Sequence, residues 1–260
     1  MNLGIKGRKA LVCASSQGLG KACALALAGE GVAVTLVARS EGPLRAAAED
    51  IRRATGAEVQ TVAADVTQDA GRAAALARLP DPDILVNNPG GRPLPGDFRA
   101  WTRKDWTDVL DAQMLSQVFF AQAVVDAMIA RRWGRIVNIT TSFVKFPQAR
   151  FAHTHGARLG LTGAMAAIGR EVARHNVTVN SILPGVFDTE ALNRNLRRLA
   201  QESGRSYEEV RAERIAQNPA RRIADPAELG QLCAYLCGDR SGFVVPRAEG
   251  RDDDAPVPER

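Results

Sequence analysis

Apolar, β-branched runs alternate with stretches of helical periodicity along this chain, and that alternation constrains its fold more than any other feature. The runs expected to form strands are KALVCA (9–14), VAVTLVAR (32–39), EVQTVAAD (58–65), DILVNN (83–88), GRIVNIT (134–140) and NVTVNSIL (176–183). Strands separated by helices favour right-handed βαβ units and a parallel sheet covered on both faces. The sequence therefore predicts an α/β fold, a doubly wound parallel sheet, in a single domain over 1–243.

Helices are expected between these strands and after the last one. Stretches with helical spacing fall at 18–31, 43–56, 69–79, 103–131, 155–175 and 220–238. The polar stretch 188–217 is also helical in character, and it forms either a lid over a bound molecule or a solvated helix pair. Since ligands bind such sheets at the carboxyl ends of the strands, the functional residues are expected at that edge.

The composition is that of a soluble globular enzyme, with 45% hydrophobic and 24% charged residues in 260 and a net charge of +5. The N-terminus lacks a signal-peptide pattern and no apolar run reaches membrane-spanning length. We therefore expect a cytoplasmic chain with no membrane partner. The arginine pairs are dispersed without interleaved aromatic residues, so no nucleic-acid partner is expected.

Four cysteines fit a reducing compartment. Cys13 and Cys23 lie in apolar stretches and are expected to be buried free thiols. Cys233 and Cys237 are four residues apart, so they share one helix face, with no neighbouring histidine or cysteine cluster to complete a metal site. No metal site is predicted.

The segment CASSQGLG (13–20) breaks the first strand into a turn and opens a helix at Gly18 and Gly20. Small residues there let the backbone approach a pyrophosphate, and the helix N-terminus supplies N–H donors and positive potential. A nucleotide is the expected ligand of this turn, as in the Rossmann type of doubly wound sheet.

Several motifs in chain order resemble those of the short-chain dehydrogenase/reductase family, from about residue 7 to about 243. The segment 220–238 is similar to the helix before the last strand in 3-oxoacyl-carrier-protein reductases. The matching motifs are the glycine motif with Ala14 in its first position, Asp65-Val66, the NNPG of 87–90, and Pro184-Gly185 with Thr189 downstream.

This resemblance implies a dinucleotide cofactor. The chain carries Arg39 where an acid would bind a ribose 2′-hydroxyl, and a guanidinium suits a 2′-phosphate, so NADP(H) is expected before NAD(H). The alternative is that Arg39 is an exposed loop arginine, and Gln17 replaces a second basic residue often seen in the turn. The implied cofactor-binding residues are Ser15, Ser16, Gln17, Gly18, Leu19, Gly20, Arg39, Asp65, Val66, Asn88, Gly90, Arg158, Pro184, Gly185 and Thr189.

The resemblance also implies four catalytic positions, and this chain departs from the family at each. Thr141, with Ser142 beside it, falls on the carbonyl-polarising Ser, and Gln113 falls on the Asn of the water relay. Thr154 and Arg158 fall on the Tyr and Lys of the Tyr-x-x-x-Lys motif. A threonine hydroxyl is far less acidic than a phenol, and an arginine stays protonated, although it can still grip a ribose or an oxyanion.

Two histidines flank Thr154 and titrate in the neutral range, so His155 or His153 is a candidate proton donor. If His155 is the acid, reduction is expected to fade as pH rises past about 6.5. The alternative is that Thr154 caps a helix that starts near residue 155 and that both histidines are polar loop residues. His175 is expected at a helix C-terminus, where it offsets the helix dipole.

The final stretch 244–260 is rich in proline and charge, a disordered composition, where the family normally has a last strand and an Asp-Gly-Gly turn. We expect that strand to be truncated or replaced. The homo-oligomer that the resemblance implies would then be weakened.

Three functions remain open. The first is an NADP(H)-dependent oxidoreductase of the short-chain type that acts on a small carbonyl or alcohol, with a histidine or water delivering the proton. The second is a nucleotide-binding pseudoenzyme or partner subunit without turnover. The least favoured is a non-redox lyase on the same fold, because the halohydrin dehalogenases keep the tyrosine and lose the nucleotide motif, and this chain does the reverse.

Overall fold

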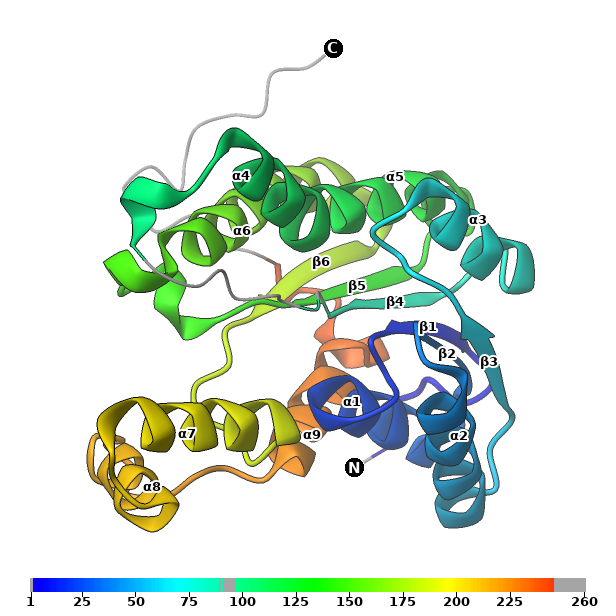
Figure 1. The fold of residues 1–260 in the computed structure, drawn as a ribbon. Coiled ribbons are helices and arrows are strands. Elements are labelled where there is room, and N and C mark those ends of the chain that lie inside the picture. The colour runs from blue at the N-terminus through cyan, green and yellow to red at the C-terminus, as the bar shows by residue number, and fades with distance from the viewer. Residues whose placement is uncertain (1, 89, 91–96, 246–260) are drawn as a thin grey trace.

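Six parallel strands form the central sheet of the computed structural model, which describes residues 2–88, 90 and 97–245 (Figure 1). The sheet order is β3-β2-β1-β4-β5-β6, so the chain reverses its direction of growth between β1 and β4. The strands are β1 (Lys9–Cys13), β2 (Ala33–Ala38), β3 (Val59–Ala63), β4 (Ile84–Asn87), β5 (Gly134–Ile139) and β6 (Val177–Ile182). The predicted doubly wound, single-domain α/β fold is confirmed.

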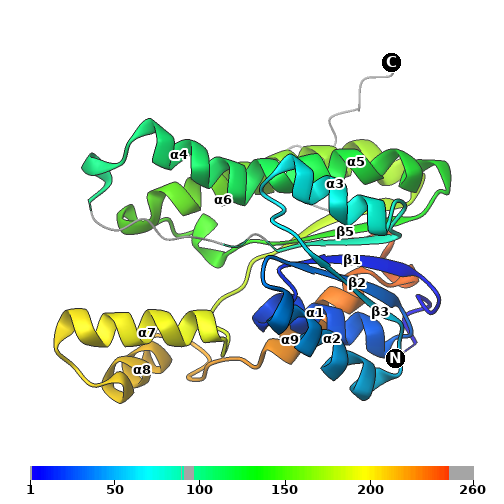
Figure 2. The same cartoon turned by 45° about the vertical axis from the view of Figure 1, so that its right-hand side comes forward.

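Helices cover both faces of this sheet (Figures 1 and 2). One face carries α1 (Gly18–Gly29), α2 (Glu41–Thr55) and α9 (Pro226–Leu236). The other carries α3 (Asp69–Arg78), α4 (Arg103–Leu110), α5 (Ser116–Ala130) and α6 (Ala152–Val172). The pair α7 (Glu190–Ser203) and α8 (Tyr207–Ala216) projects beyond the carboxyl ends of the strands.

Local sequence explains the helix boundaries. Gly56 ends α2 in the left-handed conformation, and Gly204 does the same for α7. Capping boxes begin three helices, formed by Thr102 with Asp105, Ser206 with Glu209, and Asp225 with Glu228. The polar stretch 188–217 forms a helical hairpin of α7 and α8. The two helices share a small apolar cluster of their own, formed by Leu196, Ala200 and Val210.

Each face of the sheet has its own apolar core, because strands covered on both sides are apolar on both sides. Leu27, Leu36 and Ile51 are among the buried residues beneath α1 and α2. Phe120, Met128 and Leu161 belong to the core beneath α5 and α6. All four cysteines are free and buried, which confirms the expectation for Cys13 and Cys23.

The helix predicted near 103–131 contains one π-helical turn, Asp111–Leu115, between α4 and α5. Among the described residues, the stretch Arg103–Ala130 is also the one helix long and apolar enough to cross a membrane. Its buried Phe120, Val124 and Met128 lie in the second core, so it serves as a core helix of this sheet.

Helix α6 begins at Ala152, three residues before the predicted start, because a 3₁₀ turn over Ala149–Phe151 leads directly into it. Thr154 is therefore inside the helix, and the expectation that it caps the helix is wrong. His153 and His155 are not loop residues either, since they are 0% and 4% exposed. Aromatic rings bury them: Trp101 lies 4.3 Å from His153, and Phe143 lies 5.2 Å from His155, between ring centres. His175 does end the 3₁₀ turn that follows α6, as expected.

The described chain ends beside β6 without adding a strand to the sheet. The side chain of Asn180 in β6 donates to the Val244 carbonyl oxygen at 2.8 Å, while Phe243 is 94% exposed. The tail predicted over 244–260 lies outside the described residues except for 244 and 245. Its predicted disorder and its effect on assembly stay predictions.

Candidate active site

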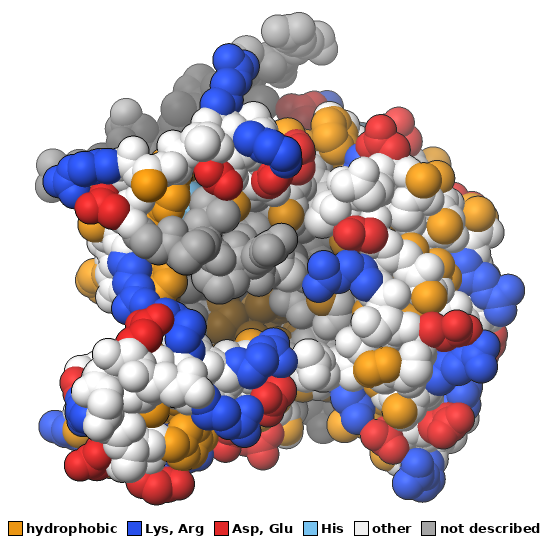
Figure 3. Space-filling view, viewed as in Figure 1, with side chains coloured by type: hydrophobic (Ala, Val, Ile, Leu, Met, Phe, Trp, Pro, Cys, Tyr) orange, Lys and Arg blue, Asp and Glu red, His pale blue; other side chains and the backbone are white. Residues whose placement is uncertain are grey.

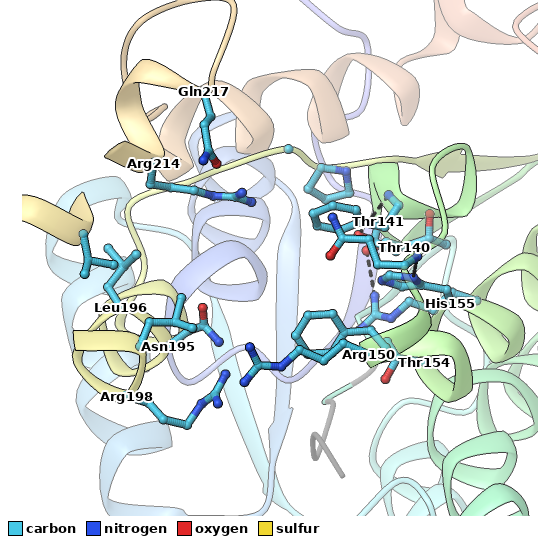
Figure 4. Close-up of a pocket in the computed structure, with 18 of the residues that line it drawn as sticks. Thr140, Thr141, Arg150, Thr154, His155, Asn195, Leu196, Arg198, Arg214 and Gln217 are labelled. Carbon is cyan, nitrogen blue, oxygen red and sulfur yellow. Dashed lines mark hydrogen bonds between the residues drawn. The ribbon is translucent and has the colours of Figure 1, made fainter. Parts of the chain in front are cut away.

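A cavity of about 680 Å³ lies at the carboxyl ends of β4, β5 and β6, and α7 and α8 close its far side (Figure 4). Residues after β5 and β6 form one wall, the first turns of α6 form a second, and the helical hairpin forms the third. This is the edge where the sheet order predicts ligand binding. The residues expected to act in catalysis or binding that line it are Leu19, Asn88, Thr141, Thr154, His155, Arg158, Pro184 and Gly185.

The structure separates the two hydroxyl candidates after β5. Thr141 lines the cavity, and its hydroxyl oxygen accepts the backbone N–H of Phe143 at 3.4 Å, so its own proton is available to a ligand. Ser142 is not among the described residues that line the cavity, and its backbone N–H donates to the Pro184 carbonyl at 3.0 Å. Of the two hydroxyl residues, Thr141 is the one that lines the cavity.

A hydrogen-bonded chain links three of the expected catalytic residues. The guanidinium Nε of Arg158 donates to the Gln113 amide oxygen at 2.9 Å, and the amide nitrogen of Gln113 donates to the Thr154 hydroxyl at 3.5 Å. Gln113 is completely buried, and it lies in the π-helical turn between α4 and α5. Such turns recur at functional sites because they redirect one side chain out of the helical repeat.

Arg158 is also fastened to the sheet. Its Nη1 donates to the Thr140 carbonyl oxygen at 2.7 Å, directly before Thr141. Burial lowers the pKa of Arg158 to about 10, so the guanidinium keeps its charge at neutral pH. It supplies a fixed positive charge beside the cavity, and it cannot pass a proton back and forth.

The geometry of His155 argues against a proton donor at neutral pH. Its Nδ1 accepts the backbone N–H of Gln148 at 3.0 Å, so the neutral ring carries its proton on Nε2. Burial lowers the pKa of His155, and the charges of Arg158 and His153 lower it further. The expected loss of activity near pH 6.5 therefore shifts to lower pH, and the neutral ring can donate a hydrogen bond only.

His153 lies on the opposite side of α6 from the cavity. It is absent from the described lining, and its ring meets the face of Trp101 edge-on at 79°. Burial lowers the pKa of His153, partly opposed by the charge of Asp105. His153 packs against Trp101 outside the described lining of the cavity, so its role as a proton donor stays a prediction.

The turn between β1 and α1 has the backbone geometry that a glycine motif serves. Ala14 and Gly18 adopt φ values of 47° and 57°, in the left-handed region. A Cβ at Gly20 would lie 2.3 Å from the Ala14 carbonyl oxygen, so only glycine fits there. The methyl group of Thr189, which caps α7, would lie 3.5 Å from a Cβ at Gly18, so α7 starts beside this turn.

The other expected cofactor residues follow β2, β3 and β4. Arg39 is exposed directly after β2, with no hydrogen bond or ion pair to the described part of the chain. One Asp65 oxygen accepts the N–H and hydroxyl of Thr67, and Asn88 donates to the Ala14 carbonyl at 3.5 Å. Val66 follows the end of β3 and Gly90 follows the end of β4.

Three of the expected cofactor residues lie in the turn between β1 and α1. Ser16 and Gln17 lead directly into α1. Ser15 instead has a structural contact, because its buried hydroxyl donates to the Val12 carbonyl and accepts the Val37 N–H inside the sheet.

Comparison with known proteins gives one consistent result. A family model described as short chain dehydrogenase matches residues 8–199. The 3-oxoacyl-[acyl-carrier-protein] reductase of Vibrio cholerae is 30% identical over 252 residues, which cover 94% of this chain and 95% of that protein.

This chain belongs to the short-chain dehydrogenase family.

Solved structures of short-chain dehydrogenases and related reductases superpose on nearly the whole chain. L-sorbose reductase from Gluconobacter frateurii, solved with NADPH and L-sorbose, has a TM-score of 0.88 at 27% identity, covering 94% of this chain and 95% of that one. A 3-oxoacyl-(acyl-carrier-protein) reductase from Agrobacterium tumefaciens, solved with NADP, has a TM-score of 0.83 at 28% identity, covering 94% and 92%.

Sequence reasoning missed the arginines and aromatic rings that line the cavity of this short-chain dehydrogenase. Phe143, Phe151 and Arg150 lie between β5 and α6, and Arg198 and Arg214 come from the helical hairpin. Only the charge-rich pattern of 188–217 pointed to such residues. It could not tell which of the arginines face inward.

Proposed function

We propose that this short-chain dehydrogenase is an NADP(H)-dependent oxidoreductase that acts on a carbonyl and alcohol pair. The family's four catalytic positions correspond in this chain to Thr141, Thr154, Arg158 and Gln113. The observation that carries the proposal is the hydrogen-bonded chain Arg158–Gln113–Thr154. Two of its members, Arg158 and Thr154, line the same cavity as Thr141.

The residues present fit the cofactor. Gly20 leaves no room for a side chain, and Gly18 adopts a left-handed φ of 57°, which together suit close approach by a pyrophosphate at the start of α1. Arg39, with no ion pair in the described chain, would hold a 2′-phosphate, and Asp65 has one carboxylate oxygen not engaged by Thr67. When bound, a reduced nicotinamide supplies the hydride for carbonyl reduction.

The side chains of the cavity would stabilise the developing alkoxide. The Thr141 hydroxyl donates to the carbonyl oxygen, and the fixed charge of Arg158 stabilises negative charge in surroundings of low polarity. Arg158 and Gln113 do not form a proton relay, since a guanidinium and an amide do not exchange protons near neutral pH. We therefore assign the proton to water that enters the cavity.

Two matched variants test this assignment. Thr141→Val removes the hydroxyl at constant shape, and it is expected to lower kcat for carbonyl reduction about a hundredfold while NADPH affinity stays unchanged. Ser142→Ala is the control and is expected to keep wild-type kcat. The measurements are fluorescence titration with NADPH and NADH, followed by turnover on 3-oxoacyl thioesters, quinones and aldehydes. Equal losses in both variants would contradict the role of Thr141.

Because Arg158 and Gln113 do not relay protons, a second candidate is also favoured, a nucleotide-binding protein without turnover. Tight NADPH binding with no oxidation across that panel would establish it. Failure to bind either reduced cofactor would remove both candidates.

A further inference from the structure

The described lining of the cavity is cationic where it meets the helical hairpin. Five arginines line it and one glutamate does; the arginines are Arg150, Arg158, Arg198, Arg205 and Arg214, and the glutamate is Glu213. In the space-filling view, Lys and Arg side chains gather around a hollow whose floor is apolar (Figure 3). An excess of one charge at a recess of low polarity attracts ligands of the opposite charge.

Ion pairs with the protein compensate this charge only in part. Arg150 and Arg198 share one carboxylate, that of Glu202, and their hydrogen bonds lower its pKa. Arg205 pairs with Glu213 at 2.6 Å. Two guanidinium groups on a single carboxylate leave one positive charge in excess at this side of the cavity.

Arg214 differs from Arg198 and Arg205, the other hairpin arginines that line the cavity. It is partly buried, and it forms no hydrogen bond or ion pair with the described part of the chain. Its guanidinium carbon lies 6.0 Å from the centre of the Phe143 ring, and Figure 4 shows it extending from α8 into the cavity. Arg211, one turn earlier in α8, pairs with Asp188 at 3.3 Å. An arginine directed inward without a protein carboxylate is placed to receive a carboxylate from a ligand.

Apolar side chains also line the cavity beside these arginines. Phe143 and Phe151 come from the loop between β5 and α6, and Leu196 and Leu199 come from α7. A ligand that fills this cavity therefore combines a short apolar chain with one anionic end. A single charge matches Arg214, the one hairpin arginine of the described lining that has no ion pair in the described part of the chain.

We propose that the cavity selects oxo acids, that is, carbonyl compounds with a carboxylate, and that Arg214 binds the carboxylate while Thr141 binds the carbonyl. The inference rests on the proposed function for the role of Thr141. Arg214 acts in this scheme as a specificity-determining residue that touches the substrate and takes no part in hydride transfer. The recognition of the carboxylate itself can be measured without turnover.

The test compares straight-chain oxo acids with their methyl esters, by calorimetric titration of the NADP⁺-saturated protein, in which no reduction can occur, and by initial rates with NADPH. The acid is expected to bind about tenfold or more tightly than its ester, because a charge-assisted bidentate bond is lost in the ester. Arg214→Gln is expected to abolish that preference, and Arg214→Lys to restore part of it. Arg197→Gln is the matched control, since Arg197 pairs with Glu190 on the outer side of α7 and does not line the described cavity.

The two proposals fail in different ways. If esters and acids bind and react equally well, or if Arg214→Gln keeps the preference, the oxo-acid inference is overturned and the oxidoreductase stands. If acids bind through Arg214 but nothing is reduced, the oxidoreductase fails and the carboxylate site stands. Preference for phosphate esters or for acyl thioesters over oxo acids would also overturn the inference.

Discussion

The Arg158 guanidinium and the Gln113 amide, 45 positions apart in the chain, are joined by a hydrogen bond of 2.9 Å inside the molecule. The contact links α6 to the π-helical turn between α4 and α5. The amide oxygen of Gln113 accepts the Arg158 Nε–H, and its amide nitrogen donates to the Thr154 hydroxyl. The two side chains act as one structural unit, which explains how a partly buried arginine is tolerated at this position.

Replacing Gln113 by Leu tests that unit through stability. The substitution removes the acceptor of the Arg158 Nε–H in a buried site, and we expect a loss of about 1–3 kcal/mol in the free energy of unfolding. Gln113→Glu keeps an acceptor in place and is the matched comparison. Urea denaturation of the three proteins gives the measurement, and equal stability of the Leu variant and the wild type would show that the bond contributes nothing.

Ala14 offers a second test, because it holds a left-handed φ of 47° that suits glycine. Ala14→Gly relieves backbone strain of about 1 kcal/mol, and the greater flexibility of glycine in the unfolded chain offsets part of this gain. We expect an unchanged or higher melting temperature. Ala46→Gly, at an exposed position within α2, is the control and is expected to destabilise by about 1 kcal/mol.

Arg39 is expected to set the choice of cofactor. Arg39→Glu places a carboxylate where a 2′-phosphate would lie, and we expect NADPH to bind at least about tenfold more weakly while NADH affinity is kept or improved. Arg45→Gln, which removes a surface ion pair with Glu41, serves as control. Parallel losses for NADPH and NADH would contradict a contact with the 2′-phosphate.

The two buried histidines predict an acid-sensitive fold. Because burial lowers the pKa of His153 and His155, the unfolded chain binds protons more readily than the folded protein below the unfolded histidine pKa of about 6.5. Their contribution to stability is complete above that pH and is lost as pH falls through and below it. We expect each histidine to remove up to about 1.4 kcal/mol per pH unit in that window.

Chemical denaturation at pH 8, 7 and 5 checks this dependence. The free energy of unfolding is expected to change little between the first two values and to fall at the third. In His155→Asn the amide oxygen can still accept the Gln148 N–H, and the slope below pH 6.5 is expected to be shallower. The same slope in the variant would show that His155 does not contribute.

Much of the site could be predicted from local sequence, because the physical causes are local. Gly20 must be glycine since the turn brings the Ala14 carbonyl to 2.3 Å from any Cβ, and a strand–turn–helix junction carries that requirement in its own residues. The strand positions followed from apolar runs. The helix expected over 220–238 starts only at Pro226, where Asp225 and Glu228 form a capping box. Arg39 and Asp65 could be placed because Arg39 directly follows β2 and Asp65 lies two residues after the end of β3.

Contacts between distant segments decided what local sequence left open. Thr141 lines the cavity and Ser142 does not, because the loop after β5 is held by Pro184 after β6. His155 is a buried neutral ring only because Phe143 and Phe151 pack against it. Arg214 lines the cavity while Arg211 does not, a difference that depends on how α8 packs against α7. The sequence by itself determined the order of strands and helices and the nucleotide turn, since these depend on periodicity and backbone conformation. Only the tertiary structure decided which charges meet and which are left for a ligand, because burial and pairing depend on residues far apart in the chain.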